Sequence, residues 1–197
     1  MTKDIKNKLS KAHKNLMPIL NGWLVDEEQQ KSPHFSSRDE EQSVYLLVVH
    51  NISLPPAQFG GGYITDFFLG RLDTKAHPYF EEIAQLKVSA HCLITREGKV
   101  IQYVSFDDKA WHAGVSSYQG QENCNAFSIG IELEGTDDIA YSTEQYRTLS
   151  DLTKSLQRHY PEIKNNITGH SDIAPQRKTD PGKAFNWQYF TDCLNSS

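Results

Sequence analysis

An unbroken run of strand-forming apolar residues, Val44 to Val49, most constrains the fold of this chain. A run of this length without a polar interruption suits a central strand that is buried on both faces. It ends on the polar residues His50 and Asn51, at the carboxyl end of the expected strand. In open sheets, ligand sites lie at that end of the strands. A lone histidine there is more often structural, so His50 becomes a candidate site residue only if partners join it.

Further strands and helices are expected around this run. The sequence predicts strands at residues 88–95, 100–104 and 126–135, and helices at residues 63–69, 79–86, 143–160 and 187–194. Residues 26–43 are polar and contain Ser-Pro and Ser-Ser breakers, so they are expected to form a connecting loop. Ser142 and Gln145 fit a capping box at the start of the longest helix, and Pro161 ends it.

The strand expected at residues 126–135 has two faces of different character. Its apolar face carries Ile129, Ile131 and Leu133, and its other face carries Ser128, Gly130, Glu132 and Glu134. Two glutamates on one strand face are usually solvated. If that face lines a cleft, either Glu132 or Glu134 could act as a general base. The alternation alone does not separate the two.

Length and composition indicate one domain and exclude several functions. The chain has 197 residues, which is enough for one domain with a full hydrophobic core. Its net charge of −5 argues against a general nucleic-acid-binding protein, which normally has a basic face. The longest apolar run is far too short to span a bilayer. We therefore expect neither a nucleic-acid partner nor stable membrane insertion.

The cysteines bear on the cellular compartment. Cys92, Cys124 and Cys193 are odd in number and far apart, and they form no Cys-x-x-Cys pair. This pattern implies neither a disulfide framework nor a cysteine zinc finger. Unpaired cysteines fit a reducing compartment, so a cytoplasmic location is expected.

The amino terminus resembles a signal peptide only superficially. Five lysines precede the apolar segment 16–20, but Pro18 interrupts that segment and no small-residue cleavage site follows it. Apolar residues in this region fall at helical spacing: Ile5, Leu9, Ala12 and Leu16. Residues 1–20 are therefore predicted to form an amphipathic extension whose partner is unknown, and residues 21–197 the main domain.

The stretch from residue 168 to residue 182 concentrates groups that can carry chemistry. It is too rich in Gly, Pro and short polar residues for a helix or a strand, so it is expected to be a loop. His170 can bind a metal through a neutral imidazole, and Asp180 can bind one through a carboxylate oxygen. Lys178 could present a positive charge to the same pocket. The alternative is a surface loop with solvated charges.

A metal site would need a third ligand, and His50 can supply it. Two histidines and one carboxylate leave a fourth tetrahedral position for water, as in catalytic zinc sites. The separations are 120 residues (170 − 50) and ten residues (180 − 170). Spacings this long are not diagnostic by themselves, unlike the short His-Glu-x-x-His signature.

A second stretch of unusual content runs from residue 111 to residue 120. It combines the aromatic rings of Trp111, His112 and Tyr118 with hydroxyl and amide groups. Such groups stack on the faces of sugars and form hydrogen bonds with polar ligands. The alternative is a loop that Trp111 alone packs onto the core.

Six segments, in this order, carry a resemblance to a known family. They are Val48–Ser53, Val88–Ile94, Ala110–Gly114, Ser128–Leu133, Thr168–His170 and Arg177–Gly182. Together they closely resemble the zinc-dependent N-acetylmuramoyl-L-alanine amidases of the type 2 amidase and peptidoglycan-recognition-protein superfamily. The resemblance covers about residues 20–190, nearly the whole chain.

The resemblance implies a fold and a set of site residues. It implies a single α/β domain in which helices flank a central mixed β-sheet and a zinc cleft lies at one sheet edge. It places Zn²⁺ on His50, His170 and Asp180, and it places catalysis on Glu132 and Lys178. The substrate-binding residues that it suggests are Asn51, Trp111, His112 and Tyr118. Asn123 stands where the family often has a basic residue near the peptide carboxylates, and Lys87 is the alternative for that role.

The resemblance also implies a reaction. The expected function is hydrolysis of the amide bond between the lactyl group of (1,6-anhydro-)N-acetylmuramic acid and the L-alanine of the stem peptide, during muropeptide recycling in the cytoplasm. The expected partner is a small-molecule anhydromuropeptide.

Three alternatives stand beside this function. The complete ligand set argues against a non-catalytic module that only binds peptidoglycan fragments. A phosphodiesterase-like hydrolase would commonly use two metals and more ligands. The absence of a signal peptide and the unpaired cysteines argue against an external amidase that acts on intact cell wall.

Overall fold

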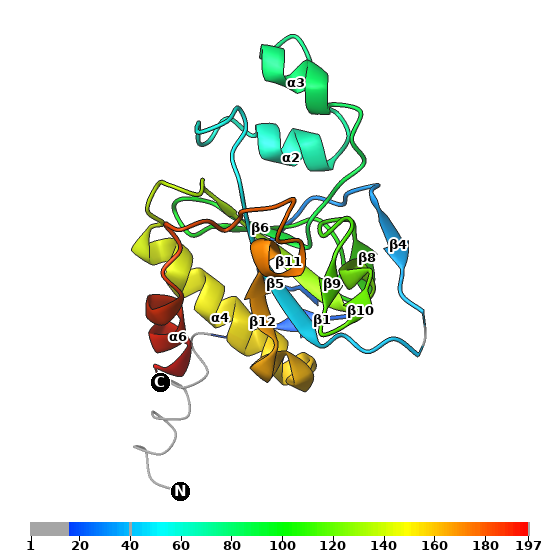
Figure 1. Ribbon diagram of the computed structural model, residues 1–197, viewed down its shortest axis with the longest axis vertical. Helices are drawn as coiled ribbons and strands as arrows, with labels where there is room; N and C mark the ends of the chain where they lie inside the picture. The colour runs from blue at the N-terminus through cyan, green and yellow to red at the C-terminus, as the bar shows by residue number, and fades with distance from the viewer. Residues whose placement is uncertain (1–15, 40, 197) are drawn as a thin grey trace, which may run out of the picture.

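The computed structural model describes residues 16–39 and 41–196, and its centre is a six-stranded mixed sheet (Figure 1). The strands, in spatial order, are β12 (Ile167–Gly169), β5 (Leu46–Ile52), β11 (Ser128–Glu134), β6 (Cys92–Ile94), β7 (Val100–Gln102) and β3 (Glu28–Gln29). Strands β12, β5, β11 and β6 run parallel to one another, β7 is antiparallel to β6, and β3 is parallel to β7. The expected mixed sheet and α/β class are confirmed.

Short strand pairs and helices surround this sheet. The small strand pairs are β1 (Ile19–Leu20) with β2 (Trp23–Leu24), β4 (Phe35–Ser37) with β8 (Asp108–Ala110), and β9 (Ser117–Tyr118) with β10 (Gln121–Glu122). The helices are α2 (Tyr63–Phe68), α3 (Pro78–Ile83), α4 (Thr143–His159), α5 (His170–Ile173) and α6 (Trp187–Asn195), with 3₁₀ turns η1 (Cys124–Ala126) and η2 (Pro161–Asn165). None of the helices in the described ranges is long and apolar enough to cross a membrane.

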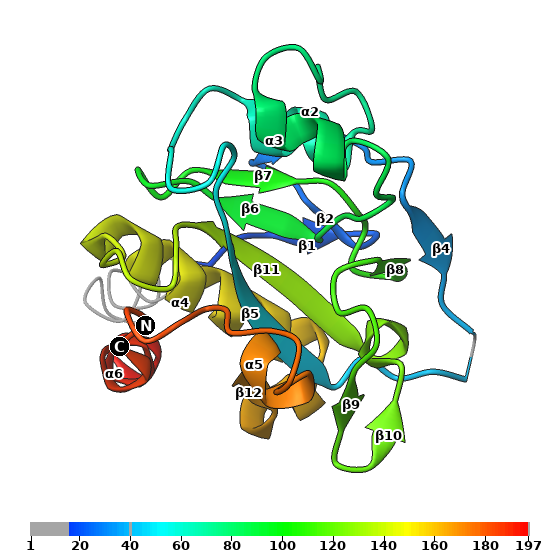
Figure 2. The same ribbon diagram turned by 45° about the horizontal axis from the view of Figure 1, so that its top comes forward.

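The two faces of the sheet are covered differently. On one face, Ile129, Ile131 and Leu133 of β11 pack against the apolar stripe of α4 and against α6. On the other face, α2 and α3 form a separate apolar cluster with β6 and β7, and they stand apart from α4 and α6 (Figures 1 and 2). The face expected to carry Glu132 is therefore the one that α4 leaves free.

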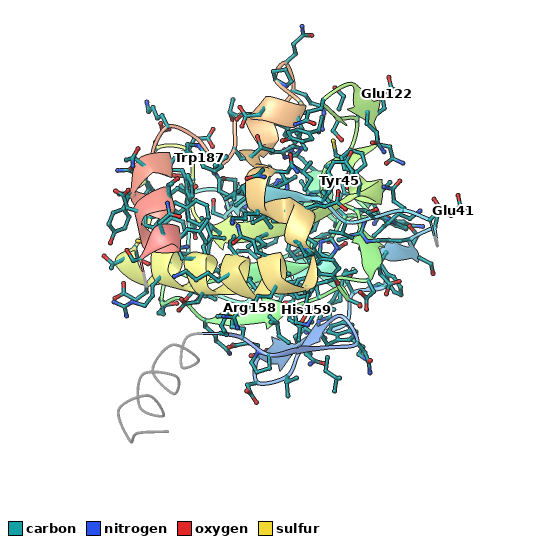
Figure 3. The ribbon with its side chains drawn as sticks, turned by 90° about the horizontal axis from the view of Figure 1, so that it is seen from below. Glu41, Tyr45, Glu122, Arg158, His159 and Trp187 are labelled. Carbon is teal, nitrogen blue, oxygen red and sulfur yellow. The ribbon has the colours of Figure 1, made fainter. Side chains whose placement is uncertain are left out.

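Helix α4 begins and ends where the sequence predicts. The Ser142 hydroxyl accepts a hydrogen bond from the Gln145 backbone N–H at 3.1 Å, and the Gln145 side chain accepts one from Ser142 N–H at 3.1 Å. This capping box satisfies two amide groups that would otherwise lack partners. Figure 3 shows α6, which begins at Trp187, at the end of α4 opposite to Arg158 and His159.

Three expectations differ from the structure. The stretch 168–182 contains the end of β12 and the short helix α5, because Asp172 accepts hydrogen bonds from Thr168 and Gly169 and so turns the chain into a helix. The connecting loop expected at 26–43 contains β3 and β4, whose backbones pair with β7 and β8. The strand expected at 88–95 is regular only over Cys92–Ile94.

The amphipathic helix predicted within residues 1–20 lies largely outside the described residues. The last two residues of that range, Ile19 and Leu20, form β1. The boundary between an extension and a main domain therefore stays a prediction.

A pair of serine substitutions tests the capping box. Replacing Ser142 with alanine removes the cap and the hydrogen bond to the Arg96 carbonyl, so we expect a loss of about 1–2 kcal/mol in the free energy of unfolding. Ser150 lies inside the same helix, and its buried hydroxyl has no hydrogen-bond partner within the described ranges. Ser150→Ala should therefore cost nothing or stabilise slightly. Urea unfolding measures both variants, and equal losses would contradict the assignment.

Candidate metal centre and active site

The pairing of β5 with β11 places His50 beside Glu132. The two strands are parallel, and Glu132 lies opposite His50 in their register. Side chains at paired positions of neighbouring strands point to the same face of a sheet. His170 joins them from the other side, because β12 pairs with β5 and His170 is the first residue after β12 (Figure 2).

Asp180 reaches the same place from the segment that follows α5. Its backbone carbonyl accepts a hydrogen bond from Ser171 N–H at 2.9 Å. The segment is held further by Asp137, which accepts the Thr179 hydroxyl through its carboxylate and the Ala184 N–H through its carbonyl. These contacts fix the direction of Asp180 from both sides.

Three ligand atoms converge where these segments meet. His50 Nδ1 lies 3.0 Å from His170 Nδ1 and 2.9 Å from Asp180 Oδ2, and His170 Nδ1 lies 3.0 Å from Asp180 Oδ2. Both histidines are buried, and the Asp180 side chain is 13% exposed. The structure thus brings together the three residues that the sequence predicts as metal ligands.

The contacts of the other ring nitrogen of His170, Nε2, indicate that Nδ1, the atom in this triangle, is an acceptor. His170 Nε2 lies 3.1 Å from the carbonyl oxygen of Ala113, which can only accept. Arg177 also approaches this nitrogen, but it donates to the carbonyls of Ala113 and Val115. In the neutral ring, the proton therefore sits on Nε2, and Nδ1 directs a lone pair at Asp180.

This donor set fits a zinc ion. A tetrahedral zinc with Zn–N and Zn–O bonds near 2.0–2.1 Å separates its ligand atoms by about 3.3 Å, close to the triangle seen here. Two imidazole nitrogens and one carboxylate oxygen are ligands that Zn²⁺ prefers. Without a cation, a carboxylate oxygen would face a nitrogen lone pair at 3.0 Å inside the protein. The three residues therefore suit a metal that keeps one position open.

Glu132 differs from every other carboxylate near the cluster. Its side chain is buried, and Oε2 has no hydrogen-bond partner among the residues that the structure describes. Burial raises the pKa of Glu132 well above its ordinary value, the charge of Asp180 raises it further, and the charge of Lys178 opposes both effects. A carboxylate with a raised pKa and a free oxygen can take up a proton and hold it.

Glu134, the other candidate base, is already engaged. Its Oε1 accepts a hydrogen bond from Gly60 N–H at 2.6 Å, and its Oε2 accepts one from Arg96 N–H at 3.1 Å. Glu134 thus joins the loop before α2 to the loop after β6. Of the two glutamates, Glu132 has an oxygen without a hydrogen-bond partner among the described residues, whereas both oxygens of Glu134 accept hydrogen bonds, so these contacts favour Glu132 as the candidate base.

A cavity of about 410 Å³ opens onto the cluster. The three clustered residues, Glu132, Lys178 and Asn51 line its polar part. Its apolar wall comes from α2, α3 and the segments around them, with Phe67, Tyr79, Ile83, Leu86, Val88 and Trp111. Of these wall residues, only Trp111 was predicted from the sequence, because the apolar pattern of a short helix does not separate core residues from cavity-lining ones.

The predicted substrate-binding residues lie in different places. Asn51 lines the cavity, and its amide nitrogen donates to Asp137 at 2.8 Å. Trp111 also lines it and donates its indole N–H to the Ser36 hydroxyl at 3.2 Å. Lys87 does not line this cavity, although its neighbours Leu86 and Val88 do.

His112 and Tyr118 already have partners inside the protein. Tyr118 lies on β9 outside the cavity and donates its hydroxyl to Asn166 at 3.0 Å. His112 borders the cavity, but its two ring nitrogens lie 2.9 Å from His50 Nε2 and 3.1 Å from the Ser128 hydroxyl. Burial lowers the pKa of His112 and of His50 below the ordinary histidine value, so both rings are neutral near pH 7.

The fold and this cluster define a class of protein. Two buried histidines and a carboxylate at an open cavity, beside a glutamate with a free oxygen, are typical of metal-dependent hydrolases. Residues 40–183 match the N-acetylmuramoyl-L-alanine amidase family. The chain belongs to that family and is an amidase rather than a non-catalytic binding module.

Individual relatives agree with this membership. The chain is 58% identical over 174 residues to the 1,6-anhydro-N-acetylmuramyl-L-alanine amidase AmpD of Escherichia coli, covering 88% of this chain and 95% of that one. It is similar to the crystal structure of a selenomethionine derivative of AmpD, with a TM-score of 0.89, 56% identity and coverage of 90% and 99%. It is also similar to E. coli AmiD in complex with anhydro-N-acetylmuramic acid-L-Ala-D-γ-Glu-L-Lys, with a TM-score of 0.56, 26% identity and coverage of 79% and 60%.

The raised pKa of Glu132 predicts how the stability of the metal-free protein depends on pH. Above about pH 4.3, unfolded chains have lost this proton and the folded state still holds it. Stability contributed by the protonated carboxyl is therefore complete below that pH, and it is lost as the pH rises through the folded-state pKa. Glu132→Gln removes this titration, so we expect the variant to become progressively more stable than the wild type as the pH increases.

Urea unfolding of both proteins in the presence of a chelator, from pH 4.5 to pH 8, measures the difference. A stability difference that does not change with pH would show that Glu132 ionises as freely in the folded protein as in the unfolded chain.

Proposed function

We propose that this chain is a zinc-dependent amidase that separates the stem peptide from 1,6-anhydro-N-acetylmuramic acid by hydrolysing the bond between the lactyl carbonyl and L-alanine. The observation that carries the proposal is the convergence of His50, His170 and Asp180 at an open cavity, beside the free oxygen of Glu132. The names of similar proteins support the substrate: AmpD is a 1,6-anhydro-N-acetylmuramyl-L-alanine amidase, and AmiD has been crystallised with an anhydromuropeptide.

His50, His170 and Asp180 would hold the zinc ion. When bound, zinc supplies a positive charge that polarises a carbonyl and lowers the pKa of water to about 7. Two neutral histidines and one carboxylate give the three ligands a net charge of −1. With a divalent cation bound, the site would therefore keep a net positive charge that attracts the substrate carbonyl. His50 and His170 hold the site rigid, because they are buried at the ends of paired strands.

Glu132 is proposed as the general base and then the general acid. Glu132 lines the cavity, so its carboxylate would accept a proton from the attacking water, and its raised pKa would let it hold that proton until the amide bond breaks. The proton would then pass to the nitrogen of L-alanine, which leaves as a neutral amine. The register of β5 and β11 keeps Glu132 next to the ligand His50 throughout.

Lys178 is proposed to stabilise the negative charge that develops on the carbonyl oxygen. It lines the cavity with the cluster, and its backbone N–H donates to the Ala174 carbonyl at 3.0 Å, which fixes the turn that carries it. Its charge acts on both Glu132 and His50. A fixed cation aimed at a developing oxyanion stabilises the transition state more than the ground state.

The apolar wall of the cavity is proposed to hold the muramyl sugar. Trp111 and Tyr79 present aromatic surface there, and aromatic rings pack well on the apolar faces of sugars. Asn51, fixed by Asp137, would offer its carbonyl oxygen to a donor on the substrate. Contacts of Lys87 and Tyr118 with substrate stay predictions, since both lie outside this cavity.

The place of the reaction also belongs to the proposal. Cys92, Cys124 and Cys193 are free cysteines, and all three lie within the described ranges. Free thiols fit the reducing cytoplasm, where muropeptide fragments would be recycled.

Mass spectrometry of the protein incubated with anhydromuramyl-tripeptide tests this function. We expect release of free tripeptide, loss of release when a chelator removes the metal, and recovery when zinc is returned. Release that continues at full rate without metal would contradict the zinc mechanism, and intact substrate in the presence of bound zinc would contradict the reaction.

Two glutamate variants, two residues apart on the same strand face, serve as matched controls. Glu132→Gln should retain zinc and lose about a hundredfold or more in turnover, because it removes the proton acceptor. Glu134→Gln should stay within about tenfold of the wild type, because an amide oxygen can still accept one of the two backbone hydrogen bonds that Glu134 accepts.

A further inference from the structure

A line of hydrogen bonds runs from Nε2 of His50, the ring nitrogen that faces away from the cluster, through His112 to Ser128 of β11. His50 Nε2 lies 2.9 Å from His112 Nδ1, and His112 Nε2 lies 3.1 Å from the Ser128 hydroxyl. The Ser128 hydroxyl lies 2.6 Å from the backbone carbonyl of Cys124. Ser128 and His50, the two partners of His112 in this line, are both buried.

The Cys124 carbonyl oxygen, at the end of this line, determines which atom donates and which accepts in each preceding hydrogen bond. The Cys124 carbonyl can only accept, so Ser128 donates its proton to it, and the Ser128 oxygen then accepts from His112 Nε2–H. A neutral His112 with its proton on Nε2 offers a lone pair at Nδ1. His50 must therefore carry its proton on Nε2, which leaves His50 Nδ1 bare and directed at the metal cluster.

The other histidine of the cluster is fixed in the same way from the adjacent residue. The Ala113 carbonyl accepts from His170 Nε2–H at 3.1 Å. The backbone N–H groups of His112 and Ala113 both donate to the Asn125 side-chain oxygen, at 3.2 and 2.8 Å. One anchored dipeptide thus orients both histidines of the cluster.

The sheet makes room for His112 in particular. A Cβ atom on Gly130 would lie 2.4 Å from Cγ and Nδ1 of His112, so the ring occupies space that only glycine leaves free. Gly130 is also the partner of a second buried histidine, His91, whose Nδ1 accepts the Gly130 N–H at 3.0 Å. His91 donates the proton on its other ring nitrogen, Nε2, to the Asp108 carbonyl at 3.1 Å, and neither contact reaches the cluster.

We propose that His112 is a positioning residue for the metal rather than a contact for the substrate, and that with Ser128 it holds His50 in the tautomer that binds zinc. The inference rests on the proposed zinc-dependent function. Outer partners of metal-binding histidines fix the ring and raise its basicity, and their removal typically weakens metal binding by about 10–100-fold. Ser128 was not among the predicted site residues, and His112 was predicted to bind substrate, because the aromatic content of its loop gives no sign of this contact.

Zinc affinity, measured by competition with a chromophoric chelator, tests the proposal in the full-length protein. His112→Phe keeps a ring but removes the acceptor, and we expect about 10–100-fold weaker zinc binding. His112→Asn retains an oxygen near the position of Nδ1 and should recover most of that loss. Ser128→Ala should weaken binding by a smaller factor. Ser150→Ala, the same change at a buried serine of α4, which covers the opposite face of the sheet, should leave zinc binding unchanged.

Nitrogen-15 NMR of the metal-free wild type reports the histidine tautomers directly. A merely structural role for His112 predicts no particular tautomer of His50, and the measurement does not depend on the folding of a variant. Long-range ¹H–¹⁵N correlations should place the ring protons of His50, His112 and His170 on Nε2. A proton on His50 Nδ1, or zinc affinity unchanged in both His112→Phe and Ser128→Ala, would overturn the inference alone. Failure of the wild type to bind zinc at all would overturn the proposed function and the inference with it.

Discussion

The parallel pairing of β5 with β11 is the constraint on which the site depends. It sets His50 opposite Glu132, and the pairing of β12 with β5 adds His170 from the next strand. Because side chains alternate between faces, a slip of one residue in either strand would turn one of these groups toward the face covered by α4. The continuous apolar run of β5 and the alternating pattern of β11 oppose such a slip. The same packing that stabilises the core therefore fixes the position of Glu132 relative to His50 and His170.

The candidate site places polar and charged groups in a buried position, and surrounding hydrogen bonds hold them there. A buried carboxyl without a full set of hydrogen bonds and three converging ligand atoms are costly to hold in a low-dielectric interior. Around them, Asp137, Asn125 and Ser128 fix the supporting segments with hydrogen bonds. The large apolar contact between the sheet, α4 and α6 lies on the opposite face of the sheet. The main hydrophobic core is therefore separate from the candidate site. The cavity wall comes instead from α2 and α3, which form their own small core.

The sequence specifies some of these features better than others. Its alternation separates the two faces of β11, and the Ser142–Gln145 pair marks the start of α4, because both patterns are local and periodic. Strands β3 and β4 could not be predicted from the sequence. Each has only two or three residues, which is too short to show a periodic pattern, and each pairs with a strand that is distant in the sequence. The grouping of His50, His170 and Asp180 comes from family resemblance rather than spacing. The partners of His112 lie 62 and 16 residues away, so the sequence alone cannot connect them.

X-ray absorption spectroscopy at the zinc edge of the zinc-loaded protein tests the central claim most directly, because it reports the ligands of the metal itself. The geometry predicts one zinc per chain with two imidazole nitrogens and two oxygens, one from Asp180 and one from water, at about 2.0–2.1 Å in a four-coordinate site. The scattering pattern of imidazole rings should be present at an amplitude that fits two histidines. Sulfur ligands near 2.3 Å, or a first shell without two imidazoles, would contradict the assignment of the metal to His50, His170 and Asp180.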